Sequence, residues 1–206
     1  MAVMRMLSWD ERYDGEEYVY GTEPSPWLMA QAPRIHPRGR VLSLGEGEGR
    51  NAVWLARRGF SVLAVDGSSV GLAKAKRLSA TRGVEITTAV ADLETWAPAV
   101  GGFDAVLLMY LHLPPTVRRR VHTMAWTSLR PGGIVILEAF TPRQLANSSG
   151  GPKQADMLYE PAVLRDDFPG VTWDVLEEID TDIDEGPLHR GRAALVRGVG
   201  ERRPSR

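Results

Sequence analysis

Short apolar runs alternate with amphipathic segments along the first two thirds of this chain. Between the runs, helical spacing of apolar positions and capping residues favour helices at 51–59, 70–81 and 117–129, with Gly59 and Gly83 ending the first two. We expect the lysines and arginines of the second helix to face solvent. Strand and helix in alternation predict an α/β protein built from βαβ units. The apolar runs that have the length of a buried strand lie at 41–44, 60–66, 84–90, 103–110 and 134–137.

The C-terminal third has a different pattern. Residues 141–170 form a predicted loop with one short helix near its end, at 161–168. Two strands, 173–183 and 192–199, follow as an antiparallel pair. The acidic residues between 174 and 185 suit a solvated strand edge better than a metal site.

The turn after the first strand carries the candidate chemistry. Its alternate glycines allow a sharp turn and a close approach of a ligand to the backbone, and the helix that follows offers backbone amides to a carboxylate or phosphate. Asp66, at the end of the second strand, is placed to accept hydrogen bonds from the hydroxyls of a ribose. Arg50 stands where the dinucleotide pattern G-x-G-x-x-G needs its third glycine, which argues against a nicotinamide-dependent oxidoreductase without excluding it. The loop reads Gly45-Glu46-Gly47-Glu48-Gly49-Arg50-Asn51.

Composition narrows the alternatives. The 206 residues suffice for one domain with a proper core, and a formal charge of -1 gives no reason to expect nucleic acid or an anionic membrane as partner. The chain has no cysteine, which excludes disulfides, thiolate nucleophiles and cysteine-based zinc sites. Residues 1–7 are too short for the apolar core of a signal peptide, so we expect a cytoplasmic protein. Oligomeric state is not determined by the sequence.

The spacing G-x-G-x-G, followed by an acid that ends the next strand, resembles the class I S-adenosylmethionine (SAM)-dependent methyltransferases. Three further motifs agree in order: Ala91-Asp92-Leu93, the strand at 103–110, and the turn and strand at 129–137. The resemblance implies a Rossmann-like three-layer αβα sandwich with a mostly parallel seven-stranded sheet and an antiparallel C-terminal strand. It also implies SAM as cofactor and S-adenosylhomocysteine as product. The single domain at 1–206 would divide into a lid at 1–33, a cofactor-binding core at 34–138, an acceptor-side part at 139–200 and a tail at 201–206.

The resemblance also assigns cofactor-binding residues. Asp92 would accept from the adenine amino group, although capping a turn toward Trp96 is an alternative role. The family usually has an acid two residues before the first glycine, where this chain has Ser43, and Glu46 and Glu48 are the substitutes we expect. The full predicted set is Gly45, Glu46, Gly47, Glu48, Gly49, Asn51, Asp66, Gly67, Ser68, Asp92, Leu93 and Met109.

The N-terminal segment carries a second resemblance. Ser8 and Glu11 have the spacing of a capping box, and Pro26 can open a helix that runs to Ala32. The pattern W-D-x-R-Y … Y-G-x-E-P-x-P is similar to small tellurite-resistance and thiopurine methyltransferases, in which this segment covers the cofactor and lines the acceptor pocket. His189, in E-G-x-x-H-x-G, matches the tellurite-resistance group, and a structural role is its alternative. The substrate-side residues implied are Trp9, Arg12, Tyr13, Tyr20, Gly21 and His189, with aromatic packing as the alternative for the tryptophan and tyrosines.

Methyl transfer from a sulfonium proceeds by in-line displacement and leaves a neutral thioether. Tyr110 and His112 follow the fourth strand beside the expected methyl position and are the predicted catalytic residues. A thiolate or a chalcogen oxyanion such as tellurite or selenite would need no base. A hydroxyl or ammonium acceptor would need one, with His112 as the first candidate and His189 as the second. The prediction is a SAM-dependent methyltransferase acting on a small molecule, with no metal. A nicotinamide-dependent oxidoreductase and a SAM-binding module without transfer activity remain alternatives.

Overall fold

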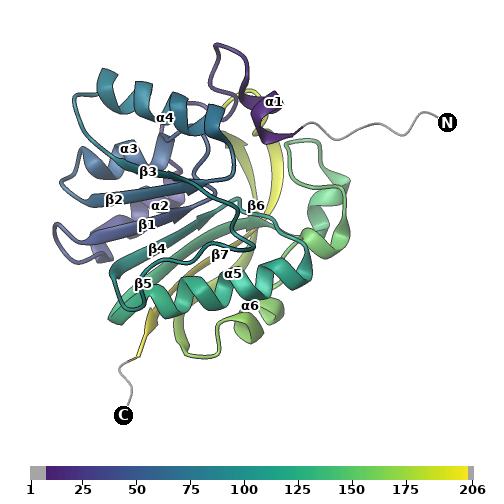
Figure 1. The fold of residues 1–206 in the computed structure, drawn as a ribbon. Coiled ribbons are helices and arrows are strands. Elements are labelled where there is room, and N and C mark those ends of the chain that lie inside the picture. Colours follow the sequence, from purple (N-terminus) through teal and green to yellow (C-terminus); the bar gives the residue numbers. More distant parts are fainter. Residues whose placement is uncertain (1–7, 204–206) are drawn as a thin grey trace.

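The computed structural model describes residues 8–203, and a seven-stranded sheet runs through its centre (Figure 1). The strand order is β3-β2-β1-β4-β5-β7-β6, in which β1 to β5 pair in parallel and β7 lies antiparallel to both β5 and β6. This arrangement confirms the predicted fold class. The strands are β1 (Arg40–Leu44), β2 (Ser61–Asp66), β3 (Thr87–Val90), β4 (Phe103–Met109), β5 (Leu129–Phe140), β6 (Val171–Asp184) and β7 (Arg190–Arg202).

Helices cover both faces of the sheet because successive strand residues point to opposite sides. Leu42 and Leu44 pack in one apolar cluster with α5 and α6, whereas Val41 packs in a second cluster with α2, α3 and α4. The helices are α1 (Trp9–Tyr13), α2 (Pro26–Gln31), α3 (Arg50–Ala56), α4 (Ser69–Thr81), α5 (Pro115–Ser128) and α6 (Pro161–Asp167), with short 3-10 turns at Ala32–Arg34, Pro142–Ala146 and Ala155–Met157.

Several predicted boundaries shift. The third strand is shorter than expected and begins at Thr87, and the expected turn at 130–133 lies inside β5 as an irregularity opposite β4. The predicted tail begins too early, because β7 continues to Arg202. The prediction about residues 1–7 concerns a segment outside the described residues.

The parallel strands end together at one edge of the sheet, where ligands of α/β proteins bind. The chain leaves β1 toward β2 on one side and continues from β4 to β5 on the other, so the switch in direction lies between β1 and β4. Two segments lie over this edge: residues 8–25, called the lid segment below, and the hairpin between β6 and β7, which curves up beside α1 in Figure 1. The backbone N–H of Leu188 in the hairpin donates to the carbonyl of Val19 in the lid segment at 3.1 Å.

None of the helices within residues 8–203 combines the length and the apolar character needed to cross a bilayer.

Candidate active site

The glycine loop connects β1 to α3 and has no room for side chains at its glycines. Gly47 has φ +63°, and a Cβ there would lie 2.6 Å from the hydroxyl of Tyr13. Gly49 has φ +92° and forms the N-cap of α3, where a Cβ would lie 2.6 Å from the Cβ of Ala75. The loop therefore needs glycine both for its backbone conformation and for the close packing of the lid segment and α4 against it.

Glu46 lies beneath this loop rather than facing outward. Its Oε1 accepts hydrogen bonds from the backbone amides of Asn51 at 3.1 Å and Ala52 at 2.9 Å, and its Oε2 accepts from the hydroxyl of Ser43. Burial raises the pKa of this carboxyl group, and the Ser43 hydroxyl and the two amides oppose that shift. We expected the amides at the start of α3 to be free for a ligand, but two of them donate to Glu46. Ser43, which stands where the family usually has an acid, donates to the same carboxylate.

Asp66 ends β2 and joins the glycine loop to α4. Its Oδ2 accepts from the amide of Gly47 at 2.8 Å and its Oδ1 from the amide of Ser68 at 2.7 Å. Burial raises the pKa of Asp66, while the two amides oppose the shift. Each carboxylate oxygen keeps a second lone pair for a ligand hydroxyl. Gly67 between them is exposed.

The remaining residues of the predicted cofactor-binding set lie at the ends of β3 and β4. Asp92 is exposed, and its Oδ1 accepts from the amide of Glu94 at 2.8 Å, which is the capping geometry of its alternative role. Leu93 and Met109 are buried in the two different apolar clusters, so their side chains serve the core.

The lid segment is fastened across the glycine loop. Its first helix has the predicted capping box, in which Ser8 and Glu11 bond reciprocally. Asp10 accepts from the hydroxyl of Ser68 at 2.5 Å, and the ring of Tyr13 is buried where Cβ atoms at Gly47 and Gly71 would otherwise lie.

Lys74 of α4 is the main anchor of this segment, contrary to the expected solvent-facing role. It is 2% exposed, its Nζ lies 2.5 Å from Glu48 Oε1, and it donates to the carbonyl of Gly15 at 2.9 Å. The carbonyls of Tyr13 and Glu17 accept from the same ammonium group. Glu48 therefore belongs to the attachment of the lid.

On the side where we predicted the methyl acceptor, several rings from distant segments pack together. The His189 ring lies 4.4 Å from that of Tyr20 and 4.6 Å from that of Tyr110. The Phe140 ring packs against the rings of Tyr110 and His189. Arg12 donates to the Tyr20 hydroxyl at 3.0 Å. Trp9 is half exposed and stacks on Tyr13 at the outer side. The predicted Gly21 lies against the backbone of the hairpin at Gly186.

Tyr110 has an unusual backbone for its residue type. Its φ is +56°, a left-handed conformation that costs about 1 to 3 kcal/mol in a residue with a large side chain. Its amide donates to the carbonyl of Glu138 at 2.7 Å, which holds the residue at the end of β4. Such strain is concentrated at functional sites in proteins.

His112 has no free ring nitrogen. The amide of Phe140 donates to Nε2 at 3.2 Å, so Nε2 must accept and the proton lies on Nδ1, which donates to the carbonyl of Met157 at 2.7 Å. Burial lowers the pKa of His112 to about 4. The side chain therefore ties the segment after β4 to β5 and to the 3-10 turn at Ala155–Met157.

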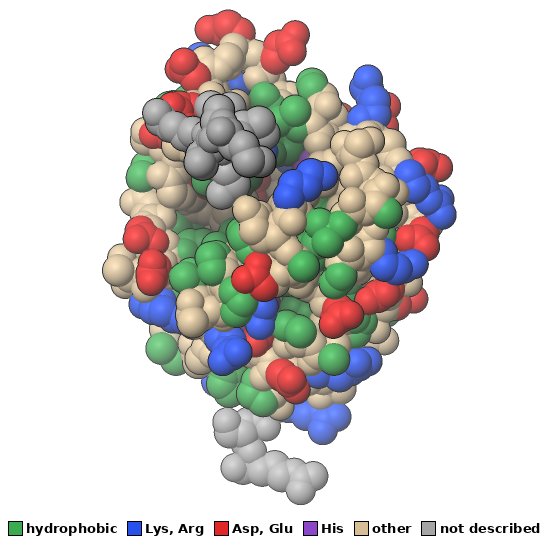
Figure 2. All heavy atoms as spheres, turned by 90° about the vertical axis from the view of Figure 1, so that its right-hand side faces the viewer, with side chains coloured by type: hydrophobic (Ala, Val, Ile, Leu, Met, Phe, Trp, Pro, Cys, Tyr) green, Lys and Arg blue, Asp and Glu red, His purple; other side chains and the backbone are tan. Residues whose placement is uncertain are grey.

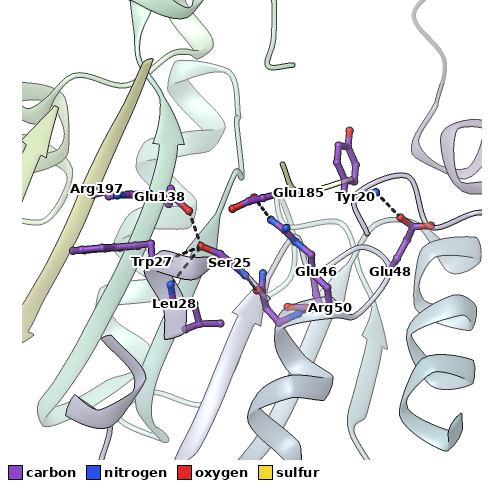
Figure 3. Close-up of polar contacts among 11 residues, drawn as sticks. Tyr20, Ser25, Trp27, Leu28, Glu46, Glu48, Arg50, Glu138, Glu185 and Arg197 are labelled. Carbon is purple, nitrogen blue, oxygen red and sulfur yellow. Dashed lines mark hydrogen bonds and ion pairs between the residues drawn. The ribbon is translucent and has the colours of Figure 1, made fainter. Parts of the chain in front are cut away.

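The sequence reasoning missed a buried polar cluster beside the glycine loop (Figure 3). Arg50 Nη2 and Glu185 Oε2 lie 2.7 Å apart with both side chains less than 10% exposed, so Glu185 is not the solvated acid that we expected. The hydroxyl of Ser25 donates to Glu138 Oε2 at 2.7 Å, and the Ser25 amide donates to Asn51 Oδ1 at 3.0 Å. These partners lie far apart in the chain, and no local spacing could have indicated them.

Comparison with known proteins agrees with this geometry. Residues 41–133 match the family model described as a methyltransferase domain. The rat glycine N-methyltransferase is 26% identical over 170 residues, which are 75% of this chain and 58% of the relative. The 2-heptyl-1-hydroxyquinolin-4(1H)-one methyltransferase of Mycobacteroides abscessus is 25% identical over 133 residues, covering 63% of this chain and 59% of the relative. The chain thus spans somewhat under two thirds of the length of these relatives.

Solved structures agree on the fold. A protein studied for the conversion of a disulfide bond into a thioacetal group during echinomycin biosynthesis has a TM-score of 0.77 at 20% identity, over 94% of this chain and 88% of that chain. TehB from Haemophilus influenzae has a TM-score of 0.70 at 16% identity, over 95% of this chain and 66% of that chain. Residues 41–133 of this chain thus match a methyltransferase domain, and the chain has the Rossmann-like fold of the class I methyltransferases.

Proposed function

We propose that this protein transfers the methyl group of SAM to a small-molecule acceptor that needs no general base. The observation that carries the proposal is the position of Asp66, whose two oxygens bind Gly47 and Ser68 and keep lone pairs at the edge of the sheet beside the glycine loop. SAM supplies an electrophilic methyl group on a sulfonium sulfur.

The chain's residues fit this cofactor. Asp66 would bind the ribose hydroxyls, and Asp92, exposed at the end of β3, would bind the adenine amino group. The side-chain-free surface of Gly45 and Gly47 leaves backbone groups for the methionine part. Glu46 and Asn51 would act indirectly by fixing the loop, since both are buried and already hydrogen-bonded within the protein.

The titratable groups on the acceptor side support an acceptor that arrives as a nucleophile. Both ring nitrogens of His112 are occupied, burial and the nearby Arg50 lower the pKa of His189 to about 3, and burial raises the pKa of Tyr110 well above its ordinary value. None of the three titrates near neutral pH, where a general base works best. A thiol, which is partly ionised near neutral pH, or a chalcogen oxyanion would meet this condition.

A small acceptor is also consistent with the outer surface. On the described part of the face in Figure 2, basic and acidic side chains intermingle and hydrophobic ones lie between them, so this face offers a polyanion no continuous basic surface. The two curated relatives are named for glycine and a quinolone as acceptors, and both compounds are small.

The test is calorimetric titration of wild type and Asp66→Asn with S-adenosylhomocysteine and with NADH. We expect only the first ligand to bind wild type, and the substitution to weaken it at least roughly tenfold, because a charged hydrogen-bond acceptor contributes about 1.5 to 3 kcal/mol. Asp182→Ala, on the exposed side of β6, is the matched control and should bind like wild type. Binding of NADH alone would refute the proposal.

If S-adenosylhomocysteine binds, labelled-methyl transfer follows on a panel of thiols, selenite, tellurite, glycine and a hydroxyquinolone. Transfer to a thiol or an oxyanion, with little dependence on His112, supports the base-free chemistry. Transfer only to glycine or to the hydroxyquinolone would refute that part and leave the methyltransferase assignment intact.

A further inference from the structure

Three buried polar atoms on the acceptor side have no hydrogen-bond partner within the described chain. They are Nη1 of Arg50, Oη of Tyr110 and Nδ1 of His189. They come from three neighbouring side chains: the Tyr110 and His189 rings lie 4.6 Å apart, and Cζ of Arg50 lies 5.8 Å from the centre of the Tyr110 ring. A buried polar atom without a partner costs about 1 to 3 kcal/mol, so three in one place indicate a polar group that binds among them.

The chemistry of these atoms specifies the group. The guanidinium nitrogen of Arg50 can only donate, and the Tyr110 hydroxyl keeps its proton because burial raises its pKa. His189 is neutral and can donate or accept at Nδ1. One obligatory donor and two groups that can each donate match an oxygen that accepts hydrogen bonds. An ammonium group would bring its own donors and its positive charge against the guanidinium of Arg50.

The surrounding charges are largely paired. Three nearby carboxylates each pair with a cation: Glu185 with Arg50, Glu138 with Arg197, and Glu48 with Lys74. Arg12 is the nearby cation without a carboxylate partner in the described structure, and it donates to the Tyr20 hydroxyl. The oxygen is therefore recognised mainly through hydrogen bonds, which both a carboxylate and a neutral carbonyl can accept.

The location places this group next to the reaction. Arg50 is the first residue of α3 and Tyr110 follows β4, so the two lie on either side of the switch point between β1 and β4, and His189 covers them from the hairpin. We propose that Arg50, Tyr110 and His189 form a subsite that binds a carboxylate or carbonyl oxygen of the methyl acceptor beside the atom that is methylated. This inference rests on the proposed function.

The test uses three probes with one aromatic ring each: benzoate, acetophenone and benzylamine. Each is titrated by calorimetry into the protein saturated with S-adenosylhomocysteine. We expect one or both oxygen probes to bind roughly five- to tenfold tighter than benzylamine, since a hydrogen bond contributes about 1 kcal/mol. If benzoate binds more tightly than acetophenone, the acceptor group is anionic. If acetophenone binds more tightly, the acceptor group is a neutral carbonyl.

Tyr110→Phe removes one donor and keeps the ring, so the oxygen preference should fall about fivefold while affinity for S-adenosylhomocysteine stays unchanged. His189→Phe is the second variant, and Tyr18→Phe, whose hydroxyl donates to the Lys74 carbonyl instead, is the matched control. Equal affinity of wild type for the three probes would overturn the subsite and leave the cofactor assignment standing. The same holds if Tyr110→Phe and His189→Phe both retain the preference for the oxygen probes. Failure of wild type to bind S-adenosylhomocysteine would overturn the proposed function, and with it the role of the subsite in methyl transfer. In that case the three probes are titrated into the protein without S-adenosylhomocysteine. Tighter binding of the oxygen probes by wild type, lost in Tyr110→Phe, would still establish an oxygen-binding site.

Discussion

On the cofactor side, Glu46 binds amides five and six residues further along the chain, and Asp66 binds Gly47 across 19 residues. On the acceptor side, Arg50 pairs with Glu185 across 135 residues, and Ser25 bonds to Glu138 across 113. The first half is a local motif held by backbone amides. The second exists only when the lid segment, the end of β5 and the hairpin come together, and it is held by buried charges.

This difference has an energetic consequence. A backbone amide can be replaced by water when a local loop loosens, whereas a buried charge that loses its partner keeps the full cost of desolvation. Substitutions in the long-range half should therefore destabilise the protein more, and those in the local half should act mainly on ligand binding.

The largest effect is expected at Lys74. Lys74→Met leaves Glu48 buried without its cation and releases the three lid carbonyls, so we expect the free energy of unfolding to fall by about 3 to 5 kcal/mol. Urea denaturation at neutral pH measures it. Lys76→Met, exposed on the same helix, is the control. Equal stabilities of the two variants would contradict the anchoring role of Lys74.

The hairpin offers a sharper comparison between adjacent residues. Glu185→Gln removes the charge that balances buried Arg50 and should cost about 2 to 3 kcal/mol. Asp184→Asn removes a partner of Arg190 at a mostly exposed site and should cost less than about 0.5 kcal/mol. Denaturation of both variants, with proteolysis of the lid segment as a second readout, tests the difference. A similar loss of unfolding free energy in both variants would mean that burial of the Arg50–Glu185 pair does not add to stability.

Buried His112 should contribute to the pH dependence of stability. Burial lowers the folded-state pKa of His112 to about 4 from its ordinary value of 6.5, so the unfolded chain binds a proton first as pH falls. Its contribution is complete above about pH 6.5 and is lost toward pH 4, amounting to roughly 2 kcal/mol between pH 7 and pH 5.

His112→Gln should therefore lose less stability than wild type between these two pH values, as measured by urea denaturation at each. His36→Gln, at an exposed position, should keep the wild-type dependence. An unchanged pH dependence in His112→Gln would show that the ring is protonated or solvated in the folded state.

The smallest effect is expected in the local half. Glu46→Gln keeps an oxygen for the amides of Asn51 and Ala52 but loses the charge, so we expect S-adenosylhomocysteine to bind about fivefold more weakly, a change of about 1 kcal/mol. Calorimetry measures it, and Glu94→Gln, exposed beyond β3, is the control. Unchanged affinity would show that loop support by Glu46 does not reach the ligand.

The sequence by itself determined the parts that depend on short spacings. Alternating strands and helices, the glycine loop, Asp66 at a strand end and the capping box at Ser8 each follow from residues that are close in the chain, and the structure has them. Glycine conformations, caps and strand periods are local properties of the backbone, so a local pattern can specify them.

Only the tertiary structure decided what the polar residues around that motif do. Lys74 resembled its solvent-facing neighbours and Glu185 resembled the other acids of the hairpin, yet both are buried in ion pairs with partners from distant segments. His112, with the sequence position of a base, has both ring nitrogens occupied by backbone groups of β5 and the following loop. Burial and partner choice depend on which segments the fold brings together, and no spacing within one segment encodes them.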